Sequence, residues 1–183
     1  MKAKALILTV ASLLVTGCAS TPPSATASTE VRLVDQRQIR NITGESRSLD
    51  AFSPKSSLIF GTHEKFYCLL VQTNLSQPAT VELSADITDA SGSSISTLLF
   101  RSDLRSYWQK YEGGFEERYA SLLSTIDRYA MPKETRDWRS GNVQYFAVLS
   151  IPADAKPSKI SAQLFINGVV EAQLELDLPP AAK

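Results

Sequence analysis

Chemically reactive side chains are few in this 183-residue chain, which has two cysteines, Cys18 and Cys68, and one histidine, His63. A metal site with two imidazole ligands is therefore excluded within one chain. A Ser-His-Asp arrangement would have to use His63, which lies in a polar segment typical of a turn. The chain has no Gly-x-Ser-x-Gly motif, phosphate-binding glycine loop or paired-cysteine zinc pattern. The sequence thus predicts no catalytic residue, metal site or cofactor, and we do not expect an enzyme.

Cys18 ends an N-terminal segment with the layout of an export signal. Lys2 and Lys4 begin the segment, and residues 5–15 form an apolar run. A helix that spans a membrane needs roughly 20 apolar residues, so this run is too short to span one. A charged start followed by a short apolar stretch is typical of a secretory signal. We therefore expect residues 1–17 to be a signal peptide.

Val15-Thr16-Gly17-Cys18 resembles the lipobox of bacterial lipoproteins, in which an aliphatic residue, a small residue and Gly or Ala precede the cysteine. The resemblance implies that the Cys18 thiol carries a diacylglyceryl group and that its amino group, exposed by cleavage, is acylated. Several acyl chains anchor a protein stably, whereas one binds marginally. By the same resemblance, Ala19 in place of Asp implies that the protein is anchored in the outer membrane and faces the periplasm. The alternative is a cleaved secretory signal in which Cys18 has no role.

The segment that follows the lipobox is predicted to be a tether. Residues 19–30 contain no large apolar side chain, so they cannot bury enough surface to order themselves. Fully extended, such a segment reaches about 40 Å. We therefore divide the chain into a signal at 1–17, a lipidated cysteine with its tether at 18–30, and a folded domain at 31–183.

The charge balance argues against a nucleic-acid partner. The chain has 19 Lys+Arg and 19 Asp+Glu, and loss of Lys2 and Lys4 with the signal leaves a net charge of −2. Binding to nucleic acid depends on a basic excess that neutralises phosphates. The membrane partner is expected through the lipid anchor alone, because no polybasic tract is present.

The folded domain has the alternation of antiparallel β-strands. Val81, Leu83, Ala85 and Ile87 alternate with polar residues, and dense apolar stretches surround Cys68, which we expect to be buried in a core strand. Turn signals separate the segments, as in a sandwich of two sheets. The predicted strands cover residues 31–35, 57–60, 66–73, 81–88, 95–100, 143–151, 160–166 and 170–178.

The last two strands are predicted to form a hairpin. Asn167-Gly168 between them favours a type I′ turn, because both residues tolerate positive φ. Simple alternation predicts that one face of the final strand holds a continuous apolar row. The members of this row are Val170, Ala172, Leu174, Leu176 and Leu178.

Two short segments resemble those of bacterial immunoglobulin-like domains. In that family a strand that ends near Asn precedes a strand that ends in an Asp-x-x-Gly turn, as Asn74-Leu75-Ser76 and Asp89-Ala90-Ser91-Gly92 do here. The resemblance implies a mainly β, antiparallel, immunoglobulin-like β-sandwich. It implies no activity, because this fold hosts many functions.

Residues 102–131 interrupt the β pattern with a predicted helical insertion. Apolar residues from Phe115 to Tyr129 recur at helical spacing, Pro132 follows, and a shorter helix is expected near 103–112. Adjacent carboxylates such as Glu116 and Glu117 diverge on a helix, which does not favour a two-carboxylate hydrolase.

The same region concentrates aromatic residues. Residues 101–140 hold both tryptophans and four of the six tyrosines, mixed with charged residues. Trp, Tyr and Arg are enriched at protein–protein hot spots, so Tyr107, Trp108 and Tyr111 are candidate partner-binding residues. The equal alternative is that these residues cover one edge of the sheet.

Three functional hypotheses remain open at this point. We favour a membrane-anchored, non-enzymatic binding or assembly module with an envelope protein as partner. Its architecture is similar to that of the lipoprotein subunit of type VI secretion membrane complexes, although no residue motif supports that analogy. The alternatives are a periplasmic carrier of a small apolar ligand, which needs an internal cavity, and an enzyme that acts on the cell wall or on glycans.

Overall fold

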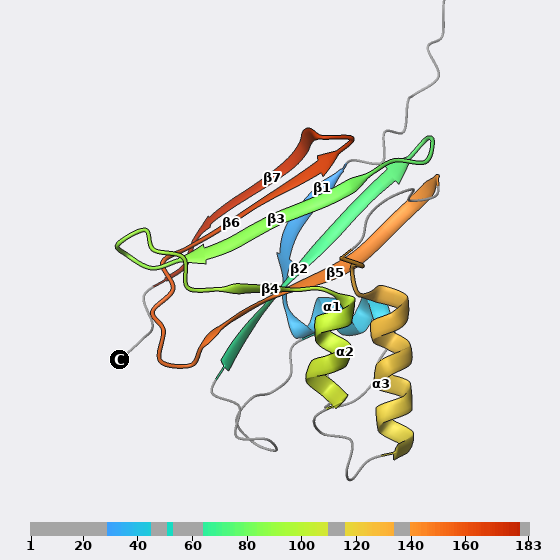
Figure 1. The fold of residues 1–183 in the computed structure, drawn as a ribbon, viewed down its shortest axis with the longest axis horizontal. Helices are drawn as coiled ribbons and strands as arrows, with labels where there is room; N and C mark the ends of the chain where they lie inside the picture. The colour runs from blue at the N-terminus through green and yellow to red at the C-terminus, as the bar shows by residue number, and fades with distance from the viewer. Residues whose placement is uncertain (1–28, 45–50, 53–63, 110–115, 134–139, 180–183) are drawn as a thin grey trace, which may run out of the picture.

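The computed structural model describes residues 29–44, 51–52, 64–109, 116–133 and 140–179, and it is mainly β (Figure 1). Two antiparallel sheets, of four and three strands, are accompanied by three short helices in the described residues. The elements are β1 (Glu30–Val34), α1 (Gln36–Thr43), β2 (Glu64–Leu75), β3 (Val81–Thr88), β4 (Thr97–Leu99), α2 (Arg101–Gln109), α3 (Glu116–Tyr129), β5 (Gly141–Pro152), β6 (Lys159–Ile166) and β7 (Val169–Asp177).

The strand order is β1-β2-β5-β4 in one sheet and β3-β6-β7 in the other. The longest pairing joins β2 and β5 over twelve residues, from Glu64 opposite Pro152 to Leu75 opposite Gly141. β1 pairs only with β2 and so confirms the predicted N-terminal edge strand. The strand predicted at 57–60 lies outside the described residues.

The first hydrophobic core lies between the two sheets. Alternate residues of β2 and β5, including Leu69, Val71 and Leu149, face Ile87, Ile160 and other side chains of the three-stranded sheet. These side chains are at most a few per cent exposed, as expected for two packed inner faces. The two antiparallel sheets with one shared core confirm the predicted sandwich arrangement at this level.

A second core lies on the opposite face of the four-stranded sheet, where the helices pack. Cys68 and Leu70 of β2 and Phe146 and Val148 of β5 contact it, together with buried residues of all three helices. The helices lie on the side of this sheet away from β3, β6 and β7 (Figure 1). The four-stranded sheet is therefore the middle of three layers. This position explains why β2 is apolar without interruption from Phe66 to Val71 and why Cys68 is buried, as predicted.

The helices α2 and α3 confirm the predicted helical insertion, which joins β4 to β5. Leu122 and Ile126 of α3 are buried, and Leu123 and Tyr129 are partly buried against the second core, as the helical spacing predicts. Phe115 lies outside the described residues. The apolar face of the insertion is thus used to cover the sheet.

The β6–β7 hairpin has the predicted turn and one unpredicted irregularity. Asn167 and Gly168 have φ of 51° and 79°, which fits a type I′ turn. A β-bulge then shifts the register, so that Leu164 pairs with Ala172 while Phe165 pairs with Val170. The prediction that Val170 shares a face with Ala172 is therefore wrong, because the extra residue on β7 reverses the alternation there.

Helix α1 was not predicted from the sequence. Its N-cap is Asp35, whose side chain accepts a hydrogen bond from the backbone N–H of Gln38 at 2.8 Å, while the Gln38 side chain accepts one from the Asp35 N–H at 3.0 Å. Gly44 ends the helix in the left-handed conformation, at φ 75°. Asp-x-x-Gln at the start and Gly at the end are the local signals for such a helix. The segment between them has only two apolar residues, so it shows no clear helical periodicity.

We predict that Asp35→Ala destabilises the domain by about 1 kcal/mol, because an N-terminal N–H of α1 loses its acceptor. Urea unfolding of the chain without its signal measures the change in free energy. Arg37→Ala is the matched control, since Arg37 is exposed on the same helix. An equal effect of the two substitutions would contradict the role of the capping box.

Candidate functional site

The candidate site that the sequence predicts lies in the helical layer, which we define as α1, α2 and α3 on the outer face of the four-stranded sheet. Asp103 stabilises the start of α2, because its carboxylate accepts a hydrogen bond from the Phe100 N–H at 2.9 Å. Leu104 and Trp108, four residues apart, fall on one face of α2 and are buried. The helix therefore forms with its apolar side toward the sheet.

Trp108 is a core residue in this arrangement. Its side chain is 3 % exposed, and its indole N–H donates to the carbonyl oxygen of Ala51 at 3.2 Å. Ala51 and Phe52 are themselves fully buried, and the Phe52 ring lies 4.7 Å from that of Phe146 on β5. Trp108 thus joins α2 to the segment 51–52 and to the sheet. Its large surface is already covered by the protein itself.

Tyr107 is partly buried and lies between Trp108 and the sheet. Its ring makes edge contacts with Phe66 of β2, at a centroid distance of 5.5 Å, and with Trp108, at 5.7 Å. Tyr111 lies outside the described residues, as does Trp138. Of the three candidate partner-binding residues, the structure therefore brings Tyr107 and Trp108 together in one aromatic cluster. Whether this cluster meets a partner remains a prediction.

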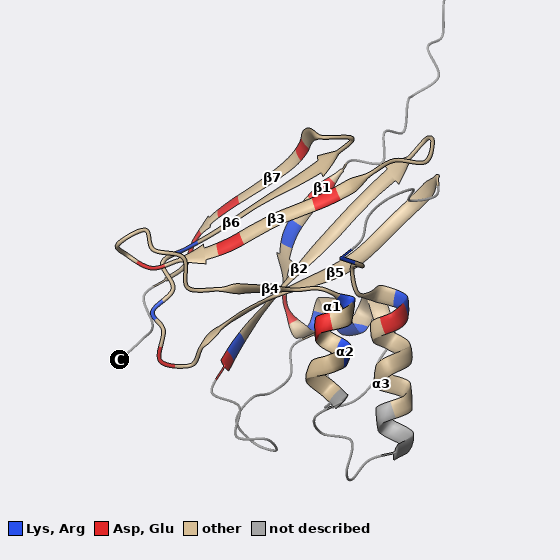
Figure 2. Cartoon of the chain, viewed as in Figure 1, with Lys and Arg blue, Asp and Glu red and all other residues tan. Residues whose placement is uncertain are grey.

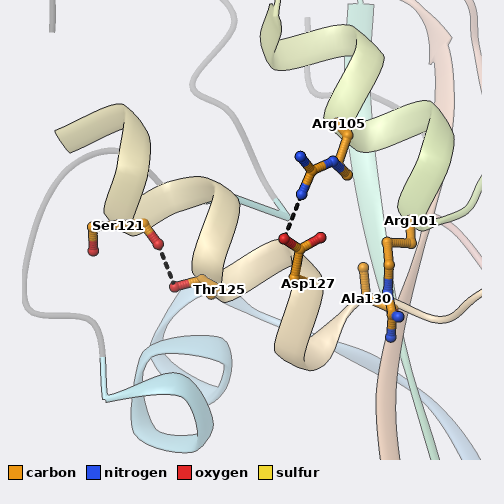
Figure 3. Close-up of polar contacts among 6 residues, drawn as sticks. All are labelled: Arg101, Arg105, Ser121, Thr125, Asp127 and Ala130. Carbon is orange, nitrogen blue, oxygen red and sulfur yellow. Dashed lines mark hydrogen bonds and ion pairs between the residues drawn. The ribbon is translucent and has the colours of Figure 1, made fainter. Parts of the chain in front are cut away.

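Polar contacts hold α2 against α3 (Figure 3). Arg101 donates two hydrogen bonds to the carbonyl oxygen of Ala130, from Nε at 3.1 Å and from Nη2 at 2.9 Å. One turn later, Arg105 forms an ion pair with Asp127. The Arg101 bonds satisfy a carbonyl at the C-terminal end of α3, where helix carbonyls lack helical partners. The half-exposed Arg105–Asp127 pair contributes less to stability, since surface ion pairs are weak.

Most exposed side chains of α2 and α3 are polar, and several of them are small. Ser102 and Ser106 on α2 and Ser121 and Ser124 on α3 are exposed, with Asp127 and Arg128 near the end of α3. No large hydrophobic residue is exposed on the described part of these helices. A partner that binds here would meet hydroxyl groups and charges rather than an apolar anchor.

A second feature, which the sequence did not predict as a site, is a shallow groove of about 290 Å³ on the outer face of the three-stranded sheet. Alternation along β3, β6 and β7 places polar side chains on this face. This alternation is the sequence signal from which a polar outer face could have been predicted. Figure 2 shows acidic residues along β3 and β7. The lining residues are Ser84, Ala85, Asp86, Ser161, Ala162, Gln163, Gln173, Leu174 and Glu175.

The carboxylates of the groove are occupied by structural contacts. Asp86 accepts hydrogen bonds from the hydroxyls of Ser94 and Ser96, each at 2.7 Å. Glu175 lies 2.7 Å from Lys159, and this hydrogen bond and charge raise the Lys159 pKa above its ordinary value. Each carboxylate therefore already has a hydrogen-bond partner within the protein. The groove can accept a polar ligand through hydrogen bonds, and it is unlike the apolar cavity that a lipid carrier needs.

Other reactive groups named from the sequence do not gather into a site in the described residues. His63 and Cys18 lie outside those residues, and Cys68 is 2 % exposed beneath the helical layer. Within the described residues, no three His, Cys, Asp or Glu side chains lie close enough to hold a metal ion. No helix in this part of the chain is long and apolar enough to cross a membrane.

The geometry defines a mainly β protein with two antiparallel sheets, one of which is covered by helices. Comparison with known proteins found no matching family model, no similar curated protein and no similar solved structure.

We predict that Trp108→Ala lowers the free energy of unfolding by about 3–5 kcal/mol, because it leaves a cavity in the second core. Trp108→Phe keeps most of the packing and removes the hydrogen bond to Ala51, so its effect should be smaller. Urea unfolding followed by far-UV circular dichroism measures both. Unchanged stability in Trp108→Ala would instead place this side chain outside the core.

Proposed function

We propose that this chain is an envelope lipoprotein, anchored through lipid on Cys18 and acting as a non-enzymatic binding or assembly module at the outer membrane. The observation that carries the proposal is the sequence Val15-Thr16-Gly17-Cys18 after a short apolar run with a basic start. The short distance along the chain between Cys18 and β1 also fits a body that is held at a membrane. β1 begins at Glu30, so eleven residues separate Cys18 from the folded body and would keep that body close to its membrane.

The strand order supports an immunoglobulin-like fold for the body. If the seven strands are lettered A to G along the chain, the two sheets have the orders A-B-E-D and C-F-G. Constant-type immunoglobulin domains place their strands in these same two groups. The Asn74-Leu75-Ser76 segment ends strand B, and Asp89 begins the turn after strand C, as in the bacterial domains that the sequence resembles.

The helical layer is our proposed site for an envelope protein partner. The sheet positions its helices rigidly, and the paired contacts of Arg101 and Arg105 hold them together. A rigid surface loses little conformational entropy on binding. Since Trp108 is buried, contact with a partner would use exposed positions of the two helices, such as Ser106 on α2 and Ser124 on α3.

We predict that Cys18→Ser releases the protein from the membrane fraction, because the acceptor of the diacylglyceryl group is lost and acyl chains provide the anchoring. Fractionation of cells with high-salt washing measures the distribution. Cys68→Ala is the matched control, since it removes the other cysteine and leaves the lipobox intact. A Cys18→Ser protein that stays with the membrane would refute the lipid anchor.

A photocrosslinking amino acid at Ser106 should capture a partner in living cells, whereas the same probe at Ser84 should not. Both positions are exposed, and Ser84 lies in the polar groove on the opposite side of the sandwich. This pair avoids replacement of the whole insertion, which would uncover the second core. A crosslink from Ser84 alone would move the binding site to the groove, and no crosslink from either would contradict a stable partner on these faces.

A further inference from the structure

Two neighbouring valines at the tip of the β6–β7 hairpin are exposed to an unusual degree. Val169 is 59 % exposed and Val170 is 39 % exposed, and Leu176 at the other end of β7, at 37 %, is the remaining large hydrophobic residue exposed in the described chain. The β-bulge on β7 explains the exposure of Val170, because it turns this residue to the side of Phe165 and away from the core, whereas Val169 pairs with Ile166 next to the turn. The hairpin tip therefore presents a small apolar surface to its surroundings.

This tip lies at the end of the sandwich where the chain enters from the N-terminal segment. We call this end, defined by Glu30, the connection 76–80 and the turn Asn167-Gly168, the tether end. Glu30 pairs with Gln72 near the end of β2, and Thr80 exchanges hydrogen bonds of 2.8 and 3.0 Å with the backbone and side chain of Asn167. Figure 1 shows the start of β1 and the β6–β7 turn at the same end.

The turns on the three-stranded-sheet side of the tether end carry no charge. Residues 76–80 and 166–170 contain no Lys, Arg, Asp or Glu. Charged residues lie nearby on the strands, where Glu82 pairs with Phe165 beside Val170, Glu171 follows Val170, and Glu30 forms an ion pair of 3.1 Å with Arg32. β5 also begins at this end, where Gly141 pairs with Leu75. The connections at the opposite end of the sandwich carry charged residues, which are Asp89, Asp154 and Lys156. Apolar and uncharged polar groups enter the headgroup region of a bilayer at less cost than charged groups do.

We propose that the hairpin tip at Val169 and Val170 inserts into the headgroup region of the membrane that holds the Cys18 lipid. This inference rests on the proposed lipid anchor. If the tether predicted from the sequence behaves as a flexible coil, its eleven residues have an average span of about 20 Å, so the anchor would keep the tether end beside the lipid surface. A tethered surface has a high effective concentration at its target, so the weak affinity of two valines is sufficient. Without the anchor, the same valines would not retain the protein on a membrane.

This contact sets the orientation of the domain. The strands run between the tether end and the charged end, so they would stand roughly upright on the membrane. The helical layer and the polar groove then face sideways, along the membrane surface, where a partner in the same envelope can reach both. The charged end, with the turn at Asp89, points away from the lipid.

A fluorescent probe at the hairpin tip tests the inference. Lipidated full-length Val169→Cys protein is labelled with an environment-sensitive dye and reconstituted in vesicles of phosphatidylethanolamine and phosphatidylglycerol that contain a spin-labelled phospholipid. Cys68 is buried, which directs the dye to the new cysteine. Ser91→Cys, in the turn at the opposite end, is the matched control. We expect loss of emission at position 169 and no loss at position 91. Adding Val170→Asp to the Val169→Cys protein should abolish the quenching.

The outcomes separate this inference from the lipid anchor. If the protein floats with the vesicles but the probe at 169 is unquenched, or both positions are quenched equally, the hairpin contact is wrong and the anchor stands. If the protein does not float, the anchor itself fails and the inference fails with it. A blue shift of the probe that grows with the concentration of unlipidated protein would assign the valines to a second copy of the chain and overturn the membrane contact.

Discussion

Burial of both faces of the four-stranded sheet is the constraint on which the rest of the structure depends. β2 and β5 lie at its centre, and their side chains alternate between the core shared with the other sheet and the core shared with the helices. Without the helices, Leu70, Phe146 and Val148 would form an apolar surface of a kind that soluble proteins rarely expose. The helical layer is therefore a structural part of the domain as well as the proposed binding surface.

This constraint limits where a function can be placed. The aromatic residues that make the insertion conspicuous in the sequence are used mainly to attach it, as the buried Trp108 and its hydrogen bond to Ala51 illustrate. The surfaces left for other molecules are the polar outside of the helices, the outer face of the three-stranded sheet, and the two ends of the sandwich. Of these, the tether end alone combines exposed apolar side chains with the point where the chain approaches its proposed anchor.

Much of the fold was predictable from the sequence, because burial leaves a periodic trace. The alternation of Val81 to Ile87 predicted β3, and Asn167-Gly168 predicted the hairpin turn. The pairing of β1 with β2, and of β5 with β4, was not predictable, because alternation reveals which face of a strand is buried and not which strand lies beside it. The bulge that reverses Val170 has no single-residue signature here. Helix α1 was not predicted because it has few apolar residues and so no clear periodicity. Its signal is the pair of capping residues, Asp35 and Gln38.

The candidate site was predictable only in part. Composition located the aromatic cluster at Tyr107 and Trp108, but it could not separate a hot spot from a buried contact, since both favour the same residue types. The groove around Ser84 and Gln163 needs β3 beside the β6–β7 hairpin, which is distant from it in the sequence, so the groove is visible only once the sheet is formed. The exposed valines likewise depend on the bulge and on the position of β1.

The lipid on Cys18 can be tested by mass spectrometry of the N-terminal peptide from the protein purified out of membranes. We expect a peptide that begins at Cys18 and carries a thioether-linked diacylglyceryl group and an acylated amino group. A peptide that begins elsewhere, or one that contains Cys18 without acyl chains, would contradict the account of this chain as a lipid-anchored envelope protein.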